Sequence, residues 1–360
     1  MSKRAYNFNA GPAALPLEVL ERAQEELVEY QGIGMSVMEI SHRSAEYEQL
    51  NAETQELLAD LLNIPAGYKT LFLQGGASTQ FAMIPLNFLT SEKVANYVIT
   101  GSWGKKALKE SKLIGETRVV AQPEKFSHVP DLSELQLDNS SAYLHITSNE
   151  TIEGIQFQQF PNIGDIPLIA DMSSDILCKP IDVSKFGLIY AGAQKNLGPS
   201  GVTLVIVKED LLENTPDHIP SMLRYDTHIK ANSLYNTPPV YSVYMVNLVL
   251  KWLKEKGGLD QVEKFNQEKT KLIYDVIDES QGFYVGTVEK QDRSIMNIPF
   301  RLKDEALEKE FLKQTQENGF VGLKGHRSVG GMRASTYNAV PYESCKALSE
   351  FMIDFQKRNG

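Results

Sequence analysis

The sequence contains few cysteines and no excess of basic residues. Only Cys178 and Cys345 stand among 360 residues, and neither belongs to a CxxC pair. This excludes a disulfide framework and a cysteine-based zinc site, and it favours a reducing, cytoplasmic setting. The net charge of −10, from 46 acidic and 36 basic residues, provides no basic surface for nucleic acid or an anionic membrane. An anionic ligand must therefore be attracted by local cations.

Long apolar runs and the common catalytic motifs are also absent. The apolar stretch 240–253 is interrupted by Asn247 and Lys251 and is too short to span a bilayer. The N-terminal residues lack the apolar core of a secretory signal. The six histidines form no HxxxH or HExxH pattern, and no GxSxG, GxGxxG or GxxxxGK[ST] motif occurs. A zinc hydrolase and a serine hydrolase are disfavoured, no nucleotide motif is present, and we expect no bound metal.

Segments typical of strands and helices alternate along most of the chain. Apolar runs predict strands at 70–74, 95–100, 142–147, 167–170 and 186–193, and helical patterns cover 16–32, 44–62, 79–89 and a lysine-rich stretch up to residue 113. Such alternation predicts an α/β domain with a mainly parallel sheet covered on both faces. The strand expected at 202–207 follows a tight connection at 198–201, which favours an antiparallel neighbour.

The last third of the chain predicts a smaller α+β unit. A helix from about residue 241 leads to Lys256-Gly257-Gly258, our expected domain boundary. Beyond it, helical patterns cover 262–277 and 342–355, and strand-like segments cover 294–300 and 320–323. We expect a large domain of residues 16–257 and a small domain formed by residues 1–15 and 258–360.

Two polar residues capable of chemistry follow predicted strands. Asp171 ends the strand at 167–170, and Lys195 follows the strand at 186–193. Because ligands of parallel sheets bind at the carboxyl ends of the strands, these two side chains are expected to lie together. A lysine can hold pyridoxal phosphate as a Schiff base, and an acid can keep its ring nitrogen protonated. The alternative for Lys195 alone is an ordinary surface lysine.

Three further strand ends carry residues that suit a phosphorylated ring. The stretch 75–78, with sequence GGAS, stands between a strand and a helix, where backbone N–H groups and the helix dipole attract an anion. Trp103 could stack on a planar ring, and Thr151 could bond a ring oxygen. A packed tryptophan is an equally good reading of Trp103 alone. A phosphate site without a nucleotide motif favours a smaller phosphorylated cofactor.

The cations are grouped unusually for an acidic protein. His42-Arg43 near the N-terminus is echoed by His326-Arg327, and Arg333 follows shortly after. Arginine can bond two oxygens of a carboxylate or a phosphate at once. These groups indicate a substrate that carries both a phosphate and a carboxylate, whereas solvated surface charge is the alternative for any single one.

The set of motifs resembles the class V aminotransferases, a family of pyridoxal-phosphate enzymes. The resemblance covers essentially the whole chain. It rests on the stretches 8–12, 39–44, 73–78, 148–154, 170–174, 192–198, 235–239 and 325–335. It implies fold type I, in which a large domain with a mainly parallel seven-stranded sheet joins a smaller α+β C-terminal domain.

The resemblance also implies roles for individual residues. Lys195 would form the Schiff base, and Asp171 would pair with the ring nitrogen. The other implied cofactor contacts are Ala77, Ser78, Trp103, Thr151, Ser173, Gln194, Asn236 and Thr237. The last two would reach the cofactor of the neighbouring subunit, which implies a homodimer with shared active sites. The residues implied for the substrate anions are His42, Arg43, His326, Arg327 and Arg333.

The reaction implied by the resemblance is amine transfer from L-glutamate to 3-phosphohydroxypyruvate. It gives O-phospho-L-serine and 2-oxoglutarate in serine biosynthesis, and some relatives also use 4-phosphohydroxythreonine in pyridoxine biosynthesis. A cysteine desulfurase, a kynureninase or an alanine-glyoxylate aminotransferase would use the same cofactor for other chemistry. A non-catalytic phosphometabolite-binding protein, in which Lys195 is only a cation, is the more distant alternative.

Overall fold

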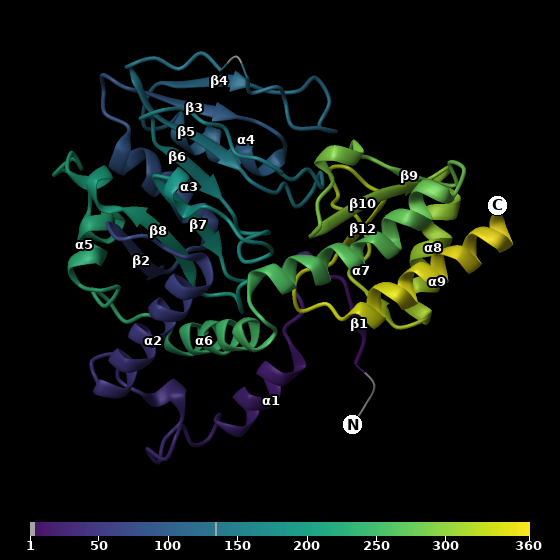
Figure 1. Ribbon diagram of the computed structural model, residues 1–360, viewed down its shortest axis with the longest axis horizontal. Helices are drawn as coiled ribbons and strands as arrows, with labels where there is room; N and C mark the ends of the chain where they lie inside the picture. Colours follow the sequence, from purple (N-terminus) through teal and green to yellow (C-terminus); the bar gives the residue numbers. More distant parts are fainter. Residues whose placement is uncertain (1–3, 134) are drawn as a thin grey trace.

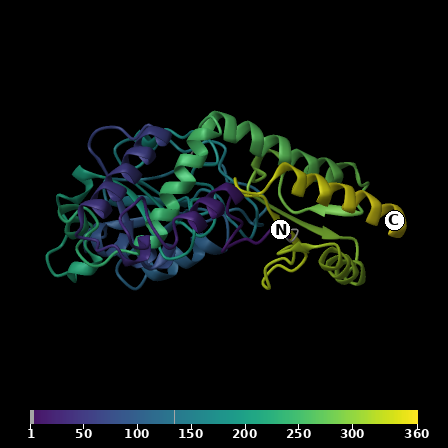
Figure 2. The same ribbon diagram turned by 90° about the horizontal axis from the view of Figure 1, so that it is seen from below.

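The chain forms a larger and a smaller lobe, and the long helix α7 (Leu259–Glu279) extends from their junction along the smaller one (Figures 1 and 2). The computed structural model describes residues 4–133 and 135–360. The C-terminal end lies at the far tip of the smaller lobe, whereas the first described residues lie close to the junction (Figure 2).

A seven-stranded sheet with the order β2-β8-β7-β6-β5-β3-β4 forms the centre of the larger lobe. Its strands are β2 (Tyr68–Leu73), β3 (Val94–Val98), β4 (Thr117–Ala121), β5 (Ser141–Thr147), β6 (Leu168–Asp171), β7 (Leu188–Gly192) and β8 (Thr203–Lys208). Strand β8 is antiparallel to both of its neighbours, and the other neighbouring pairs are parallel. The predicted mainly parallel sheet and the antiparallel strand after residue 201 are therefore confirmed.

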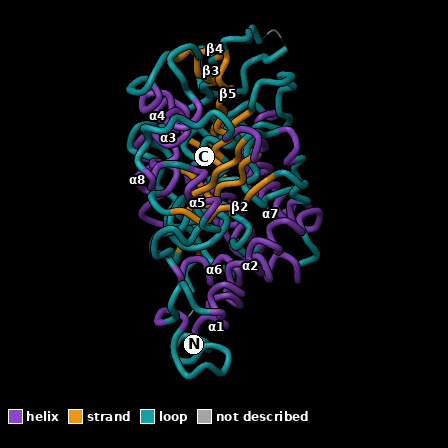
Figure 3. The backbone as a smooth tube through the Cα atoms, turned by 90° about the vertical axis from the view of Figure 1, so that its left-hand side faces the viewer, coloured by secondary structure: helices purple, strands orange, loops and turns teal. Residues whose placement is uncertain are grey.

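Helices cover both faces of this sheet (Figure 3). One face packs against α1 (Leu17–Glu25), α2 (Ala45–Leu62) and α6 (Val240–Glu255), and the other packs against α3 (Gly76–Phe88) and α4 (Ser102–Ser111). Along β6, Leu168 and Ala170 enter the first core, and Ile169 between them enters the second. Burial on both faces explains why this strand is apolar without alternation. In the described part of the chain, no helix has the length and apolarity to cross a membrane.

The smaller lobe has its own sheets and its own core. Strands β9 (Tyr284–Gly286), β10 (Asn297–Leu302) and β12 (Met332–Ser335) form an antiparallel sheet, and β1 (Tyr6–Asn7) pairs in parallel with β11 (Phe320–Val321). Helices α7, α8 (Glu305–Glu317) and α9 (Tyr342–Asn359) contribute to this core, and so does Phe8 from the N-terminal segment. The N-terminal residues thus pack with the last third of the chain.

The remaining helical elements are short. They are α5 (Tyr225–Lys230) and the 3-10 helices η1 (Val37–Glu39), η2 (Val183–Lys185), η3 (Glu209–Leu212), η4 (Ser221–Leu223) and η5 (Lys290–Asp292).

Two predicted helix boundaries were wrong. The first helix ends at Glu25 rather than near residue 32. Gln31, Gly32 and Gly34, with positive φ angles of 50°, 82° and 76°, lie in the loop that follows and exclude a helix there. The helix expected from residue 79 begins at Gly76. The glycine stretch therefore forms the first turn of α3 itself, which places its backbone N–H groups at the helix N-terminus.

Candidate active site

The carboxyl ends of five parallel strands lie along one edge of the central sheet, and a predicted site residue follows each of them. Asp171 ends β6, and Lys195 comes three residues after β7. Trp103 lies in the first turn of α4, after β3, and Thr151 follows β5. Because β7, β6, β5 and β3 are consecutive neighbours, these side chains meet at one place. Helix α3, after β2, adds its N-terminus to the same edge.

A cavity of about 280 Å³ lies at this edge, close to the lower end of the roughly 300–1,000 Å³ usual for small-molecule sites. Its lining contains every predicted cofactor contact except Asn236 and Thr237. Of the five predicted substrate residues, His326 and Arg333 line it. The structure thus brings together residues from 77 to 333 that the sequence analysis assigned to one site.

Lys195 lies inside this cavity. Its Nζ donates a hydrogen bond to Thr151 Oγ1 at 2.6 Å and lies 5.1 Å from the centre of the Trp103 ring. Burial lowers the pKa of Lys195 to about 8, although the negative charges of Asp171 and Glu150 act in the opposite direction. A larger fraction of this amine is therefore neutral near pH 7 than for an ordinary lysine, as a nucleophile requires.

Asp171 is only 5% exposed and is fixed by hydrogen bonds. Its Oδ1 accepts from the Ser173 backbone N–H at 2.9 Å and from the Ser173 hydroxyl at 2.6 Å. The same hydroxyl oxygen accepts from the Gly192 N–H at 3.0 Å. Burial raises the pKa of Asp171, while the Lys195 ammonium lowers it. Ser173 therefore links the carboxyl at the end of β6 to the end of β7.

The N-terminus of α3 offers free backbone donors. Its N-cap is Gly75, which provides no side-chain hydrogen bond, so the first N–H groups of the helix lack the usual side-chain acceptor. Gly76 has a φ of 64°, and no heavy atom lies within 4 Å of the position that a Cβ would take there. This combination of open space and helix N-terminus suits a phosphate.

A histidine and an arginine of the smaller lobe, His326 and Arg333, reach the cavity. Nδ1 of His326 accepts from the Ser328 backbone N–H at 3.3 Å, so in the neutral ring the proton lies on Nε2. Burial, followed by repulsion from Arg333, lowers the pKa of His326. Nη1 of Arg333 donates to the Thr151 carbonyl at 3.1 Å, and its buried Nε has no partner among the described residues. Donors for an anion are thus available at this wall.

The other predicted residues lie outside the cavity of this single chain. His42 is half-buried, and Arg43 and Arg327 are exposed. Asn236 Nδ2 donates to Gln74 Oε1 at 3.2 Å, and Gln74 Nε2 donates to the Thr237 carbonyl at 3.1 Å. The single chain therefore does not bring these residues into the cavity.

Three lining residues, Ala10, Gly11 and Ile152, were not predicted, and a fourth, Gly76, was predicted only as part of the anion-binding stretch 75–78. At Gly11 a Cβ would lie 3.2 Å from Cγ of Lys195, so the N-terminal segment passes directly against the lysine stem. All four lie within stretches that carried the family resemblance, which is the signal that could have identified them.

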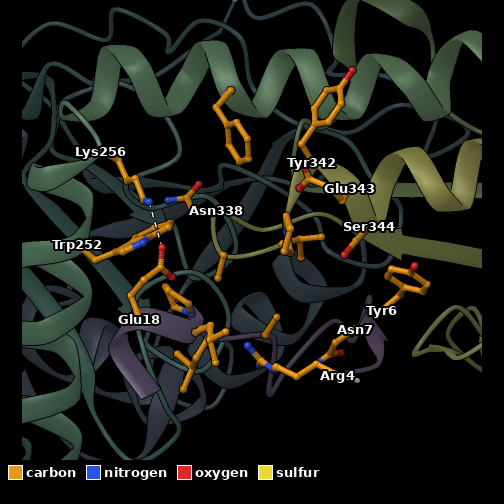
Figure 4. Close-up of a pocket in the computed structure, with 18 of the residues that line it drawn as sticks. Arg4, Tyr6, Asn7, Glu18, Trp252, Lys256, Asn338, Tyr342, Glu343 and Ser344 are labelled. Atoms are coloured by element: carbon orange, nitrogen blue, oxygen red, sulfur yellow. Dashed lines mark hydrogen bonds and ion pairs between the residues drawn. The ribbon is translucent and has the colours of Figure 1, made fainter. Parts of the chain in front are cut away.

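A larger cavity of about 640 Å³ lies elsewhere, between the N-terminal segment and the start of α9 (Figure 4). Its wall includes Trp252, Phe265 and Val340, and an ion pair of 3.1 Å joins Lys256 to Glu18 beside it. None of the predicted site residues lines this cavity. The smaller cavity is therefore the candidate active site, because it alone of the two combines a half-buried lysine, a buried acid and a helix N-terminus.

The residues of the smaller cavity fit pyridoxal phosphate. A buried amine, a fixed carboxyl group and an uncapped helix N-terminus correspond to the aldehyde, the ring nitrogen and the phosphate of that molecule. The buried Nε atom of Arg333 has no partner among the described residues. It is therefore a donor that the cofactor does not need and that remains available for a substrate carboxylate.

Comparison with known proteins agrees with this geometry. Residues 5–348 match the family described as Aminotransferase class-V, and the chain belongs to this family. Phosphoserine aminotransferase from Niallia circulans is 65% identical over 362 residues and covers 100% of both chains. The solved phosphoserine aminotransferase from Bacillus circulans subsp. alkalophilus superimposes with a TM-score of 0.98, at 64% identity over 100% of both chains. The phosphoserine aminotransferase from Trichomonas vaginalis, solved with pyridoxal phosphate bound, has a TM-score of 0.93 at 42% identity, covering 97% of this chain and 100% of that one.

Proposed function

We propose that this chain transfers the amino group of L-glutamate to 3-phosphohydroxypyruvate, giving O-phospho-L-serine and 2-oxoglutarate, with pyridoxal phosphate as its cofactor. The observation that carries the proposal is the cavity in which Lys195, Asp171 and the N-terminus of α3 meet. The full-length identity of 65% to a phosphoserine aminotransferase supports the choice of substrates.

The cofactor would be held by residues from four strand ends. The backbone N–H groups of Ala77 and Ser78 would bind its phosphate, Trp103 would stack on its ring, and Asp171 would pair with the ring nitrogen. Gln194 and Ser173 complete the wall beside Lys195. When bound, pyridoxal phosphate supplies an electron sink that stabilises negative charge at the substrate α-carbon.

Lys195 serves as the amine that binds the cofactor and then as the group that carries a proton. Once substrate displaces it, the amine would take the proton from the substrate α-carbon as a general base and would deliver it to the cofactor as a general acid, rather than back to the α-carbon. A pKa of about 8 suits both tasks, because the neutral and protonated forms are both populated near neutral pH. The Thr151 hydroxyl, which accepts from Nζ at 2.6 Å, orients this amine.

The substrate anions would be bound by the cations of the smaller lobe and of the N-terminal region. Arg333, with its free Nε, takes the α-carboxylate. His326 and Arg327, together with His42 and Arg43, take the phosphate of phosphoserine and the distal carboxylate of glutamate. Because the whole chain carries a net charge of −10, a doubly anionic substrate must be attracted by these local cations.

The active protein is proposed to be a homodimer in which Asn236 and Thr237 reach the neighbour's cofactor phosphate. Their position outside the single-chain cavity supports this assignment. Met38 and Tyr235 are 57% and 50% exposed, as expected if a partner covers them. If the sites are shared, mixing inactive Lys195→Ala and Asn236→Ala proteins restores activity, because each mixed dimer contains one intact site.

Three further assignments accompany this function. The domain division at residues 16–257, with 1–15 and 258–360 together, is supported by the separate core that unites Phe8 with the last third of the chain. A reducing cytoplasm suits the two free, buried cysteines. A second substrate, 4-phosphohydroxythreonine, carries the same phosphate and carboxylate and could use the same cations.

Two substitutions test the proposal. Lys195→Ala is expected to abolish transamination while the protein still binds pyridoxal phosphate noncovalently, and near-normal turnover would refute the assignment. Arg327→Leu is expected to raise the KM for O-phosphoserine about ten-fold and that for glutamate less, as loss of a hydrogen bond to a charged group predicts. The neighbouring exposed cation Lys324 provides the control variant Lys324→Leu. Equal effects of Arg327→Leu on both substrates would contradict a phosphate-specific role.

The alternative of a cysteine desulfurase finds no support in the described residues. Such an enzyme needs an accessible thiolate, and Cys178 and Cys345 are both buried. Burial raises the pKa of Cys345 to about 12 and raises that of Cys178 as well. A non-catalytic phosphometabolite-binding protein would be colourless, so the absorption spectrum distinguishes this alternative from the proposed enzyme.

A further inference from the structure

Two buried carboxyl groups cap the helix that carries Trp103. Glu150 accepts from the backbone N–H groups of Trp103 and Gly104, through Oε2 at 3.0 Å and Oε1 at 2.9 Å. Glu153 Oε1 accepts from the backbone N–H of Ser102 at 3.0 Å and from its hydroxyl at 2.6 Å. All three N–H groups at the start of α4 are therefore bound by carboxylates from a distant segment of the chain.

The two carboxyl groups are close neighbours and largely shielded from water. Glu150 is 0% exposed and Glu153 is 8% exposed. A Cβ placed on Gly101 would lie 2.6 Å from Cδ of Glu150 and 2.5 Å from Oε2 of Glu153, so both groups flank this glycine. Burial, followed by the charge of Glu153, raises the pKa of Glu150, whereas the backbone N–H donors of Gly104 and Trp103 lower it by stabilising the ionised form. Placing two acids here is unfavourable by itself, and the N-terminal dipole of α4 offsets part of that cost.

The segment that provides these acids also contacts the lysine of the active site. Thr151 lies between Glu150 and Glu153, and its hydroxyl accepts from Lys195 Nζ. The Thr151 carbonyl accepts from Arg333. One short segment after β5 therefore fixes the lysine on one side and the first turn of α4 on the other.

The two acids use their oxygens differently. Both oxygens of Glu150 accept from backbone donors, whereas Glu153 Oε2 has no partner among the described residues. A glutamine at 150 would bring an NH₂ group against a backbone N–H donor, because an amide has only one acceptor oxygen. A glutamine at 153 can direct its oxygen to Ser102 and leave its NH₂ at the unused position. The same substitution is thus disruptive at one position and tolerated at the other.

We propose that Glu150 is a positioning residue for Trp103: its carboxylate fixes the first turn of α4, and through it the indole, against Lys195. Glu153 supports the same turn through Ser102 alone. The inference rests on the proposed function only for the stacking of the indole on the cofactor. The placement of Trp103 itself can be tested without cofactor.

The test uses Trp103 fluorescence. The chain contains two tryptophans, so the Trp252→Phe protein reports on Trp103 alone. In this background, Glu150→Gln is expected to shift the emission of Trp103 to longer wavelength and to increase its quenching by acrylamide. Glu153→Gln is expected to leave both unchanged. Melting temperature and circular dichroism confirm that each variant is folded.

A second measurement connects this placement to cofactor binding. With Glu150→Gln, the Kd for pyridoxal phosphate should rise about ten-fold, the effect of losing one charge-assisted hydrogen bond in an ordered site. With Glu153→Gln it should stay within about two-fold, since that variant keeps its capping bonds. If the starting protein binds no pyridoxal phosphate, the proposed function fails while the fluorescence comparison still decides the role of Glu150.

Two outcomes would overturn the proposal. One is a folded Glu150→Gln protein whose Trp103 emission and quenching match those of its parent. The other is an equal change in both glutamine variants, which would assign the effect to lost negative charge rather than to the capping bonds. If Glu150→Gln does not fold, Glu150→Asp replaces it in the comparison, since it keeps the charge but is one methylene too short to reach both donors.

Discussion

The pKa of Lys195 sets how much of the reactive amine is neutral. An ordinary lysine has a pKa of 10.5, and burial lowers that of Lys195 to about 8. At pH 7 this shift increases the neutral fraction about 300-fold, because each pKa unit changes the proton equilibrium ten-fold. The cofactor-free protein should therefore show one lysine whose reactivity increases as pH rises through about 8 and then levels off.

Competitive labelling measures this directly. The cofactor-free protein is treated with trace acetic anhydride between pH 6 and 10, and acetylation of the Lys195 peptide is followed by mass spectrometry. Lys109, which is exposed on α4, serves as the internal control. The expected midpoint for Lys195 is near pH 8. A midpoint near 10 or above would refute the claim that burial dominates at this site.

The charges next to Lys195 predict the direction in which substitutions should shift this labelling midpoint. Asp171 raises the pKa of Lys195 by stabilising its ammonium, so Asp171→Asn should move the midpoint below 8. Asp175→Asn is the matched control, since Asp175 acts in the same direction but more weakly. An upward shift with Asp171→Asn would contradict the electrostatic reasoning, whatever the midpoint of the unmodified protein.

Three further predictions concern other parts of the chain. Gly76→Val strains a backbone with φ of 64° by about 1–3 kcal/mol, and its side chain fills the anion site. It should therefore reduce the affinity for pyridoxal phosphate more than that for pyridoxal. The control Gly34→Val, at a similar φ in an open loop, should leave both affinities unchanged. Burial lowers the pKa of Lys269 to about 7, so the unfolded chain binds more protons between pH 7 and 10.5 and stability should rise with pH there, by up to about 1.4 kcal/mol per unit. Lys269→Met should reduce that slope in urea titrations, most clearly between pH 7 and 8, because Lys195 contributes a similar slope only above about pH 8; an unchanged slope would disprove the assignment. Cys178 and Cys345 are both buried, so Ellman's reagent should detect no thiol until the protein unfolds, and fast labelling of the native protein would contradict this.

The sequence alone predicted those helices and strands whose apolar pattern matches the burial of their faces in the fold. The strand at 167–170 is apolar because both faces of β6 are buried, and Asp171 could be placed because a strand end is a ligand position in this fold class. The antiparallel β8 followed from the tight connection before it. Strand β4, in contrast, was missed. It contains Arg118 and has an exposed valine at position 119, as an edge strand allows.

Other features depend on contacts between distant segments, which a local pattern does not contain. The pairing of Tyr6 with Phe320 joins residues separated by most of the chain. The role of Glu150 was also hidden, because a glutamate after a strand is usually solvated and only the fold brings it under the N-terminus of α4. Tertiary placement, rather than residue type, distinguishes these groups from ordinary surface charges.

The visible absorption spectrum of the purified protein shows whether Lys195 holds pyridoxal phosphate and whether O-phosphoserine donates its amine to it. It is recorded before and after addition of O-phosphoserine without a keto-acid acceptor. We expect a yellow protein, from pyridoxal phosphate bound to Lys195 as a Schiff base, whose visible band disappears as phosphoserine donates its amine. A yellow protein that responds only to another amino acid would contradict the proposed substrate. A protein that stays colourless after incubation with pyridoxal phosphate would contradict the assignment of Lys195 itself.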